Sequence, residues 1–230
     1  MPVWLNLIFV FSLLIAILCA VWIAHDCRRY PQRMGIMNLV WPLCALFGSL
    51  PLVWFYRRHG RATGGHTYGD TPMPIAVAKG ALHCGSGCML GDMIAETMVA
   101  LVPAVLVPLG WPGLFDEKMF AAWVLDFIFA FGLGIVFQYF AIAPMRGLGP
   151  GDGIVAALKA DALSLISWQV GMYGAMAIAV FGIFRPLFNV TPDAASPAFW
   201  FAMQFAMIAG LATAYPMNWW LIRAGIKERM

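Results

Sequence analysis

Charged residues are scarce in this chain of 230 residues. Only 11% of the residues are Asp, Glu, Lys or Arg, whereas 62% are hydrophobic, and the mean hydropathy is +0.81. A soluble domain usually carries about 25% charged residues, so this composition excludes a soluble protein. The net charge of +3 is spread over short segments, which excludes nucleic acid as a partner. The sequence therefore predicts an integral membrane protein.

Several familiar motifs are also absent. The chain has no HExxH, P-loop, G-x-S-x-G or Glu-x-x-His pattern. Only His83 among four histidines falls inside a predicted membrane helix, which argues against a haem held by two histidines. Five cysteines in apolar surroundings do not fit a disulfide framework. The N-terminal apolar run has neither a positively charged start nor a cleavage site, so we expect it to remain as a first span.

Six apolar runs are long enough to cross a bilayer, which takes about 20 residues. They cover approximately residues 3–23, 37–56, 81–109, 119–142, 154–183 and 198–221. We therefore expect an all-α, polytopic transmembrane helical bundle that forms a single membrane domain over residues 1–230. Pro103 and Pro108 predict a kink near the end of the third run.

The distribution of Lys and Arg leaves two topologies open. Six spans with both termini in the cytoplasm place nine of these residues inside and five outside, in moderate agreement with the positive-inside rule. The exception is the first loop, from His25 to Gly35. If run 37–56, which contains Pro42 and Pro51, is re-entrant, that loop is also cytoplasmic and the split becomes twelve against two. Five spans plus a re-entrant segment is thus the alternative to six spans.

The third run carries the main candidate site: His83, Cys84, Cys88, Asp92 and Glu96. On a helix, Cys84, Cys88 and Asp92 fall within an arc of ~80°, and Glu96 follows ~40° further round. His83 points ~100° away from Cys84, so it joins the site only if the helix begins or bends there. Ionisable side chains inside a bilayer are costly and are therefore functional candidates. Thiolates beside carboxylates indicate a soft metal ion first and redox chemistry second.

A simpler interpretation is a packing helix. Buried cysteines often serve as small hydrophobic residues. The glycines around the patch would let another helix backbone approach closely; they are Gly80, Gly85, Gly87 and Gly91.

Polar or sulfur-containing side chains on other runs are candidates for a pathway: Gln138, Asp161, Met203, Gln204 and Met207. A buried carboxylate needs a partner, so Asp161 and Gln138 should face the helix that bears Cys84. We expect Asp161→Asn to leave the fold intact. The two methionines match a spacing that lines copper importers, although methionine more often fills packing gaps. Asp126 lies eight residues after Lys118, which favours a place at the membrane interface.

Five segments resemble a bacterial membrane family catalogued as domain of unknown function 4396. They are Met37–Leu43, His83–Asp92, Phe137–Arg146, Lys159–Asp161 and Tyr215–Glu228. The resemblance runs from about residue 34 to the C-terminus. It implies a compact polytopic fold and a bacterial origin, and it supplies no biochemical function. Some relatives carry a heavy-metal-associated domain, which gives weak support to a metal ligand.

The leading hypothesis is a bacterial inner-membrane protein that binds or moves a soft metal ion, copper before zinc. Cys84 and Cys88 would be ligands, His83 or Met89 could complete the shell, and Asp92 and Glu96 would pass the ion or protons onward. One alternative is a membrane enzyme with Cys84 as nucleophile or redox thiol. Another is a non-catalytic subunit of a larger membrane complex. The expected partners are the lipid bilayer, the metal ion and either a second copy or such a complex.

Overall fold

The computed structural model describes residues 1–62 and 71–229, and the described part is helical without strands. Its elements are α1 (Val3–Arg29), α2 (Met37–Phe55) with the π-helical turn η1 (Tyr56–Gly60), α3 (Met73–Leu101), the 3-10 turn η3 (Pro103–Leu109), α4 (Lys118–Arg146), α5 (Pro150–Ala177) with η4 (Ile178–Phe184) and α6 (Arg185–Phe188), and α7 (Pro197–Arg223). The predicted all-α bundle is confirmed. By length and composition alone, five segments could cross a membrane, namely α1, α2 with η1, α4, α5 with η4 and α6, and α7, and α3 with η3 would be a sixth, bent one.

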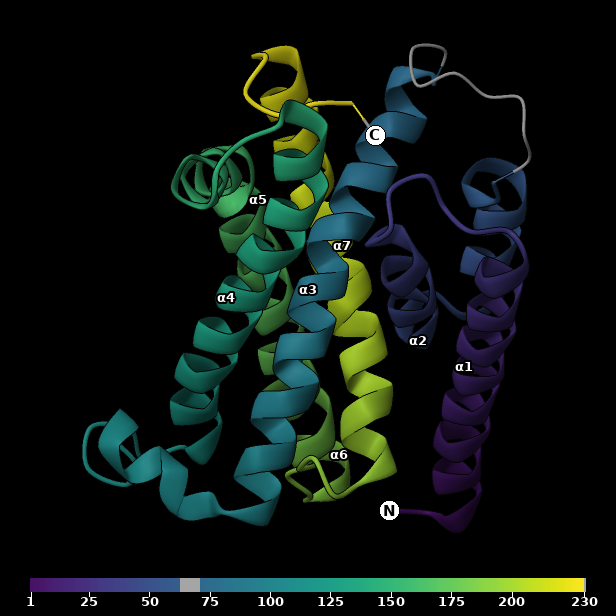
Figure 1. Ribbon diagram of the computed structural model, residues 1–230. Coiled ribbons are helices and arrows are strands. Elements are labelled where there is room, and N and C mark those ends of the chain that lie inside the picture. Colours follow the sequence, from purple (N-terminus) through teal and green to yellow (C-terminus); the bar gives the residue numbers. More distant parts are fainter. Residues whose placement is uncertain (63–70, 230) are drawn as a thin grey trace.

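The segment formed by α2 and η1 is a helical hairpin rather than a straight helix (Figure 1). Its backbone leaves helical geometry at Ser49, with φ 45° and ψ −135°. In a straight helix Trp41 and Tyr56 would be ~22 Å apart, yet their ring centroids lie 5.4 Å from each other. The chain therefore turns back at Ser49, and both ends of the hairpin lie at the same end of the bundle.

Polar contacts hold the returning arm of the hairpin to the end of α1. Asp26 of α1 accepts hydrogen bonds from the hydroxyl of Tyr56 at 2.9 Å and from the guanidinium of Arg61 at 2.8 and 2.9 Å. Arg61 also stacks over the ring of Tyr30, 4.0 Å from its centroid. Of the two topologies that the sequence left open, five spans plus a re-entrant segment therefore describes this arrangement.

The two termini lie at opposite ends of the bundle (Figure 1). The prediction that both share one side of the membrane is wrong, because the hairpin returns to the side from which it started and leaves an odd number of crossings. Part of the loop predicted after the hairpin, residues 63–70, lies outside the described residues.

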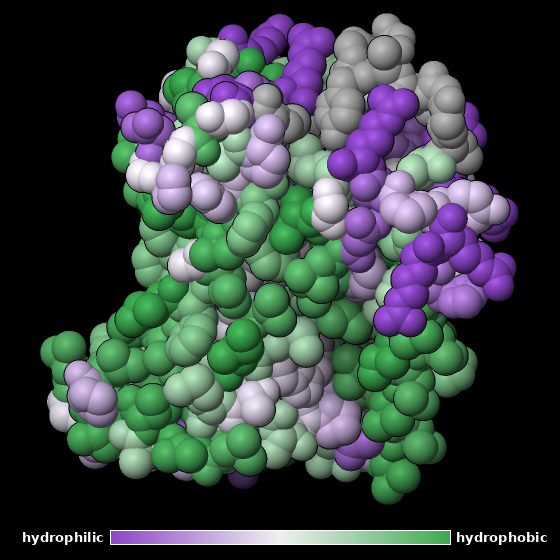
Figure 2. Space-filling model, in the orientation of Figure 1, coloured by the Kyte–Doolittle hydropathy of each residue, from purple (hydrophilic) through white to green (hydrophobic). Residues whose placement is uncertain are grey.

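The basic residues are distributed unequally between the two ends of the bundle. Lys118 and Arg185 lie at the end that holds the N-terminus, and the other twelve of the fourteen Lys and Arg residues lie on or near the opposite end. Figure 2 shows hydrophilic side chains gathered at that opposite end, above a largely hydrophobic body. The positive-inside rule therefore predicts that the end of the bundle that holds the C-terminus faces the cytoplasm. At the other end Arg185 pairs with Glu117 at 2.7 Å, and this contact lowers the pKa of Glu117.

We expect the two ends to react oppositely with an impermeant thiol reagent. Single cysteines would replace exposed Leu114, between η3 and α4, and Gly149, between α4 and α5, in a cysteine-free background. In intact cells Leu114→Cys should be labelled and Gly149→Cys should be labelled only after permeabilisation. A tag at the N-terminus should follow Leu114, and a tag at the C-terminus should follow Gly149. Identical labelling of both termini would contradict the five-span topology.

Helix α3 lies against α2, α4, α5 and α7, so one long face of it is enclosed. It begins at Met73, eight residues before the predicted run, and it ends at Leu101, where η3 departs at 107°. The bend confirms the kink predicted from Pro103 and Pro108. Two glycines of α3 let this helix lie close to α4. A Cβ atom added to Gly87 would lie 2.7 Å from the Cα atom of Gly134, and one added to Gly91 would lie 2.5 Å from the Cα atom of Ala130.

Candidate site: a polar column inside the helix bundle

All five candidate residues of α3 are buried. The exposed fraction is 0% for His83, Cys84, Cys88 and Asp92 and 5% for Glu96. Because α3 remains regular from Met73 to Leu101, Cys84, Cys88, Asp92 and Glu96 follow one another along its enclosed side. We call these four residues, together with Asp126 of α4 and Asp161 of α5, the polar column.

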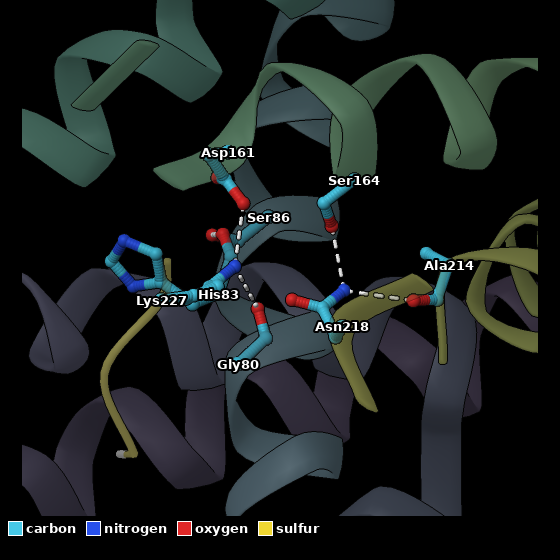
Figure 3. A network of polar contacts seen from close by, with 8 residues as sticks. All are labelled: Gly80, His83, Ser86, Asp161, Ser164, Ala214, Asn218 and Lys227. Carbon is cyan, nitrogen blue, oxygen red and sulfur yellow. Dashed lines mark hydrogen bonds and ion pairs between the residues drawn. The ribbon is translucent and has the colours of Figure 1, made fainter. Parts of the chain in front are cut away.

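At the end of the column near the C-terminus, Asp161 forms an ion pair with Lys227 (Figure 3). The Nζ atom of Lys227 lies 2.5 Å from Oδ1 of Asp161 and 3.4 Å from the carbonyl oxygen of Gly80, and neither side chain is exposed. Beside them, the amide of Asn218 donates to the hydroxyl of Ser164 at 2.6 Å and to a carbonyl one turn back on α7 at 2.8 Å. Asp161 thus has the basic partner that a buried carboxylate requires.

This ion pair changes one expectation. Asp161→Asn was expected to leave the fold intact, but the substitution would leave the ammonium of Lys227 buried without a counter-charge. Removal of one partner of a buried ion pair typically costs about 3–5 kcal/mol. We therefore expect Asp161→Asn to be destabilising.

Further along the column, three acidic side chains gather, and none of them forms an ion pair among the described residues. Glu96 lies beside Asp126 of α4, and Asp92 lies near both of these acids. The oxygens of Asp92 and Asp126 are buried; the amide of Gln169 lies beside Asp92, and the carboxyl group of Glu96 lies beside Asp126. An unpaired carboxylate at such depth is costly, so each group must hold a proton or a cation.

The thiols lie between these two acidic regions. The Sγ atoms of Cys84 and Cys88 are neighbours, and Cys44 of α2 lies close to Cys84 and donates to the carbonyl oxygen of Leu82 at 3.2 Å. All five cysteines of the chain are free thiols. The proximity of Cys44 was not predicted, because it depends on how the re-entrant hairpin packs on α3.

Among residues 1–62 and 71–229, no three His, Cys, Asp or Glu side chains are placed so that they could hold a metal ion together. His83 lies on a different side of α3 from the thiols, and its buried ring lies 6.4 Å from that of Phe137 and beside the backbone of that residue. A metal site with three or more protein ligands is therefore not formed here, although two neighbouring thiols remain.

The pathway candidates on other helices are buried, but their contacts differ. Gln138 of α4 and Asp161 turn inward, at 1% and 0% exposure. Gln204 of α7 donates a hydrogen bond to the carbonyl oxygen of Leu46 at 2.8 Å and accepts one from the hydroxyl of Ser12. It therefore supplies a donor to a backbone carbonyl group near the break in α2. Met203 and Met207 belong to the main hydrophobic core, which agrees with the packing role that the sequence also allowed.

Three polar residues of the site were not singled out from the sequence. Asp126 is fully buried inside the bundle, and Asn218 and Lys227 complete the Asp161 network. The contacts of Asn218 and Lys227 join residues that are 54 and 66 positions apart in the chain. For Asp126 the sequence held one local indication of burial, because this residue is the ninth of α4 and lies more than two turns inside the helix.

Comparison with known proteins gives one match. No curated protein and no solved structure matches the chain. The sequence model of one family matches residues 75–227, which run from the first turn of α3 to Lys227 and so include the polar column. The resemblance noted at Met37–Leu43 lies before this match. The chain belongs to the family described as Domain of unknown function (DUF4396).

Proposed function

We propose that the protein carries a soft metal ion, copper before zinc, across a bacterial inner membrane along the polar column. The observation that carries this proposal is the cluster of buried carboxyl groups of Asp92, Glu96 and Asp126, none of which forms an ion pair in the described part of the chain. Groups of this kind inside a membrane protein typically mark ion pathways or proton relays. The rise from Cys84 to Glu96 is ~18 Å, more than half of a hydrocarbon core of ~30 Å.

The thiols supply the selectivity in this proposal. Thiolates prefer Cu(I) and Zn²⁺ over hard cations. Cu(I) can be held by two thiolates, so the neighbouring pair Cys84 and Cys88 is sufficient for transient binding. Each thiol must lose a proton when it binds metal. The carboxyl groups of Asp92, Glu96 and Asp126 can relay those protons along α3 and α4, because each group releases its own proton to the next as it receives one.

The two alternatives receive less support. An enzyme with a reactive cysteine needs a thiol that a substrate can reach, whereas Cys84 and Cys88 are fully buried. A non-catalytic subunit would need no unpaired acid in its interior, because such groups only lower stability. Co-purification of partner chains would favour the non-catalytic subunit.

The experiment measures metal content and metal flux of the same protein. Chain purified under reducing, anaerobic conditions should retain about one soft metal ion per chain after incubation with Cu(I). Proteoliposomes that contain it should take up Cu(I) faster than empty liposomes. The double variant Cys84→Ser with Cys88→Ser should lose both properties.

The matched control replaces Cys19 and Cys27, two buried cysteines of α1 that lie outside the column. This control should keep wild-type metal content and flux. If the Cys84/Cys88 variant retains as much metal as the control, the proposal fails.

A further inference from the structure

The side chain of Lys227 enters the bundle from the segment that follows α7. After Arg223 the chain turns back at Gly225, where φ is +70°, and the backbone amides of Ile226 and Lys227 both donate to the carbonyl oxygen of Leu221. This turn points Lys227 between α3 and α5, where its side chain is 0% exposed. A lysine is rarely buried to this extent, so its surroundings must favour a cation strongly.

Those surroundings are built from oxygen atoms of three helices. Oδ1 of Asp161 and the carbonyl oxygen of Gly80 contact the ammonium directly. The amide of Asn218 donates to Ser164 and Ala214, and this fixes its Oδ1 atom on the side of Gly80 and Lys227 (Figure 3).

This site has more acceptors than the ammonium uses. Oδ2 of Asp161 and Oδ1 of Asn218 are both buried and form no hydrogen bond with the ammonium, although the thiol of Cys84 and the hydroxyl of Ser164 lie beside the carboxylate of Asp161. Carboxylate, carbonyl and amide oxygens are ligands for hard cations and not for soft metals. The chemistry of this end of the column therefore differs from that of the thiol pair.

We propose that Asp161, Asn218 and the carbonyl group of Gly80 form a binding site for a small, hard monovalent cation, and that Lys227 is its tethered occupant. When the segment after α7 lies down, the ammonium fills the site and closes the column at the cytoplasmic end. When the segment lifts, a free cation takes its place. The closing role rests on the function proposed above, whereas cation binding at Asp161 does not.

The test uses Lys227→Ala in the full-length chain, purified in detergent in a buffer whose only salt is choline chloride. Addition of ammonium, methylammonium or sodium chloride at 100 mM should raise the melting temperature of this variant by about 3–5 °C, because a cation then binds only the folded state. Choline is too large for the site and serves as the control for ionic strength. Wild-type protein should show no such rise, because Lys227 already occupies the site.

The double variant Asp161→Asn with Lys227→Ala decides between a site and a general salt effect. It should not respond to any of the three cations. An equal response of the double variant, or equal stabilisation of Lys227→Ala by choline, would overturn the proposal, as would no response of Lys227→Ala at all.

If Lys227→Ala does not fold in choline chloride, the yield of monodisperse protein purified in ammonium chloride replaces the melting temperature as the measured quantity. Failure to recover it in any salt while the double variant folds would also overturn the proposal. Melting involves no flux, so a negative result here leaves the metal experiment unaffected, and the absence of metal flux leaves this one unaffected.

Discussion

Replacement of Gly91 by valine is expected to lower the melting temperature in detergent by about 5–10 °C, or to prevent isolation of folded protein. The new Cβ would lie 2.5 Å from the Cα atom of Ala130, and backbone cannot yield as a flexible side chain can. Helices α3 and α4 would have to separate, and the contact between Glu96 and Asp126 would be lost with them. Overpacking of this kind costs about 1–3 kcal/mol or more.

Gly132 provides the matched control for this substitution. It lies on α4 two residues from Ala130, and an added Cβ would meet nothing within 4 Å. Gly132→Val should therefore leave the melting temperature within about 2 °C of the wild type, because an open helical position has no packing to disturb. Similar melting temperatures for the two variants would show that α3 and α4 are not closely packed.

Replacement of both Asp92 and Asp126 by asparagine is expected to lower metal flux at least about tenfold without loss of stability. Neither carboxyl group has a basic partner in the described part of the chain, so no ion pair is broken. The melting temperature should stay equal or rise, because two groups that are costly to bury in charged form are replaced by neutral ones. Flux of Cu(I) into proteoliposomes should fall at least about tenfold, since proton transfer by a positioned acid or base typically contributes 10²-fold or more.

The control for this double variant is Asp116→Asn, which changes an exposed acid near the same end of the bundle. Its flux and melting temperature should equal those of the wild type. Unchanged flux in the Asp92/Asp126 variant would remove the carboxyl groups from the pathway. A large loss of stability would instead indicate that they are structural.

The sequence predicted the spans well because each span is a local property, an apolar run of sufficient length. The reversal at Ser49 was open only as an alternative. Both arms of the hairpin are apolar, and Pro42 and Pro51 are compatible with a kink as well as with a turn. What decides between them is the contact of Trp41 with Tyr56 and of Tyr56 with Asp26, which are tertiary contacts.

The site divides in the same way. The spacing of Cys84, Cys88, Asp92 and Glu96 predicted one face of one helix, and all four side chains are indeed buried. Lys227 gave no comparable signal, because it lies among charged residues at the end of the chain and had the pattern of a topology determinant. Its burial follows from the turn after α7, which no periodicity reveals.

The bond between Gln204 and the carbonyl oxygen of Leu46 has a consequence for biosynthesis. These residues are 158 positions apart, and the acceptor lies where α2 breaks inside the bundle. A nascent chain that has not yet completed α7 has no such donor for this carbonyl group, and an unsatisfied backbone group in lipid costs several kcal/mol. The re-entrant hairpin can therefore reach its final position only after the last helix has been made. A membrane-insertion intermediate that lacks α7 should still expose this segment to quality-control proteases.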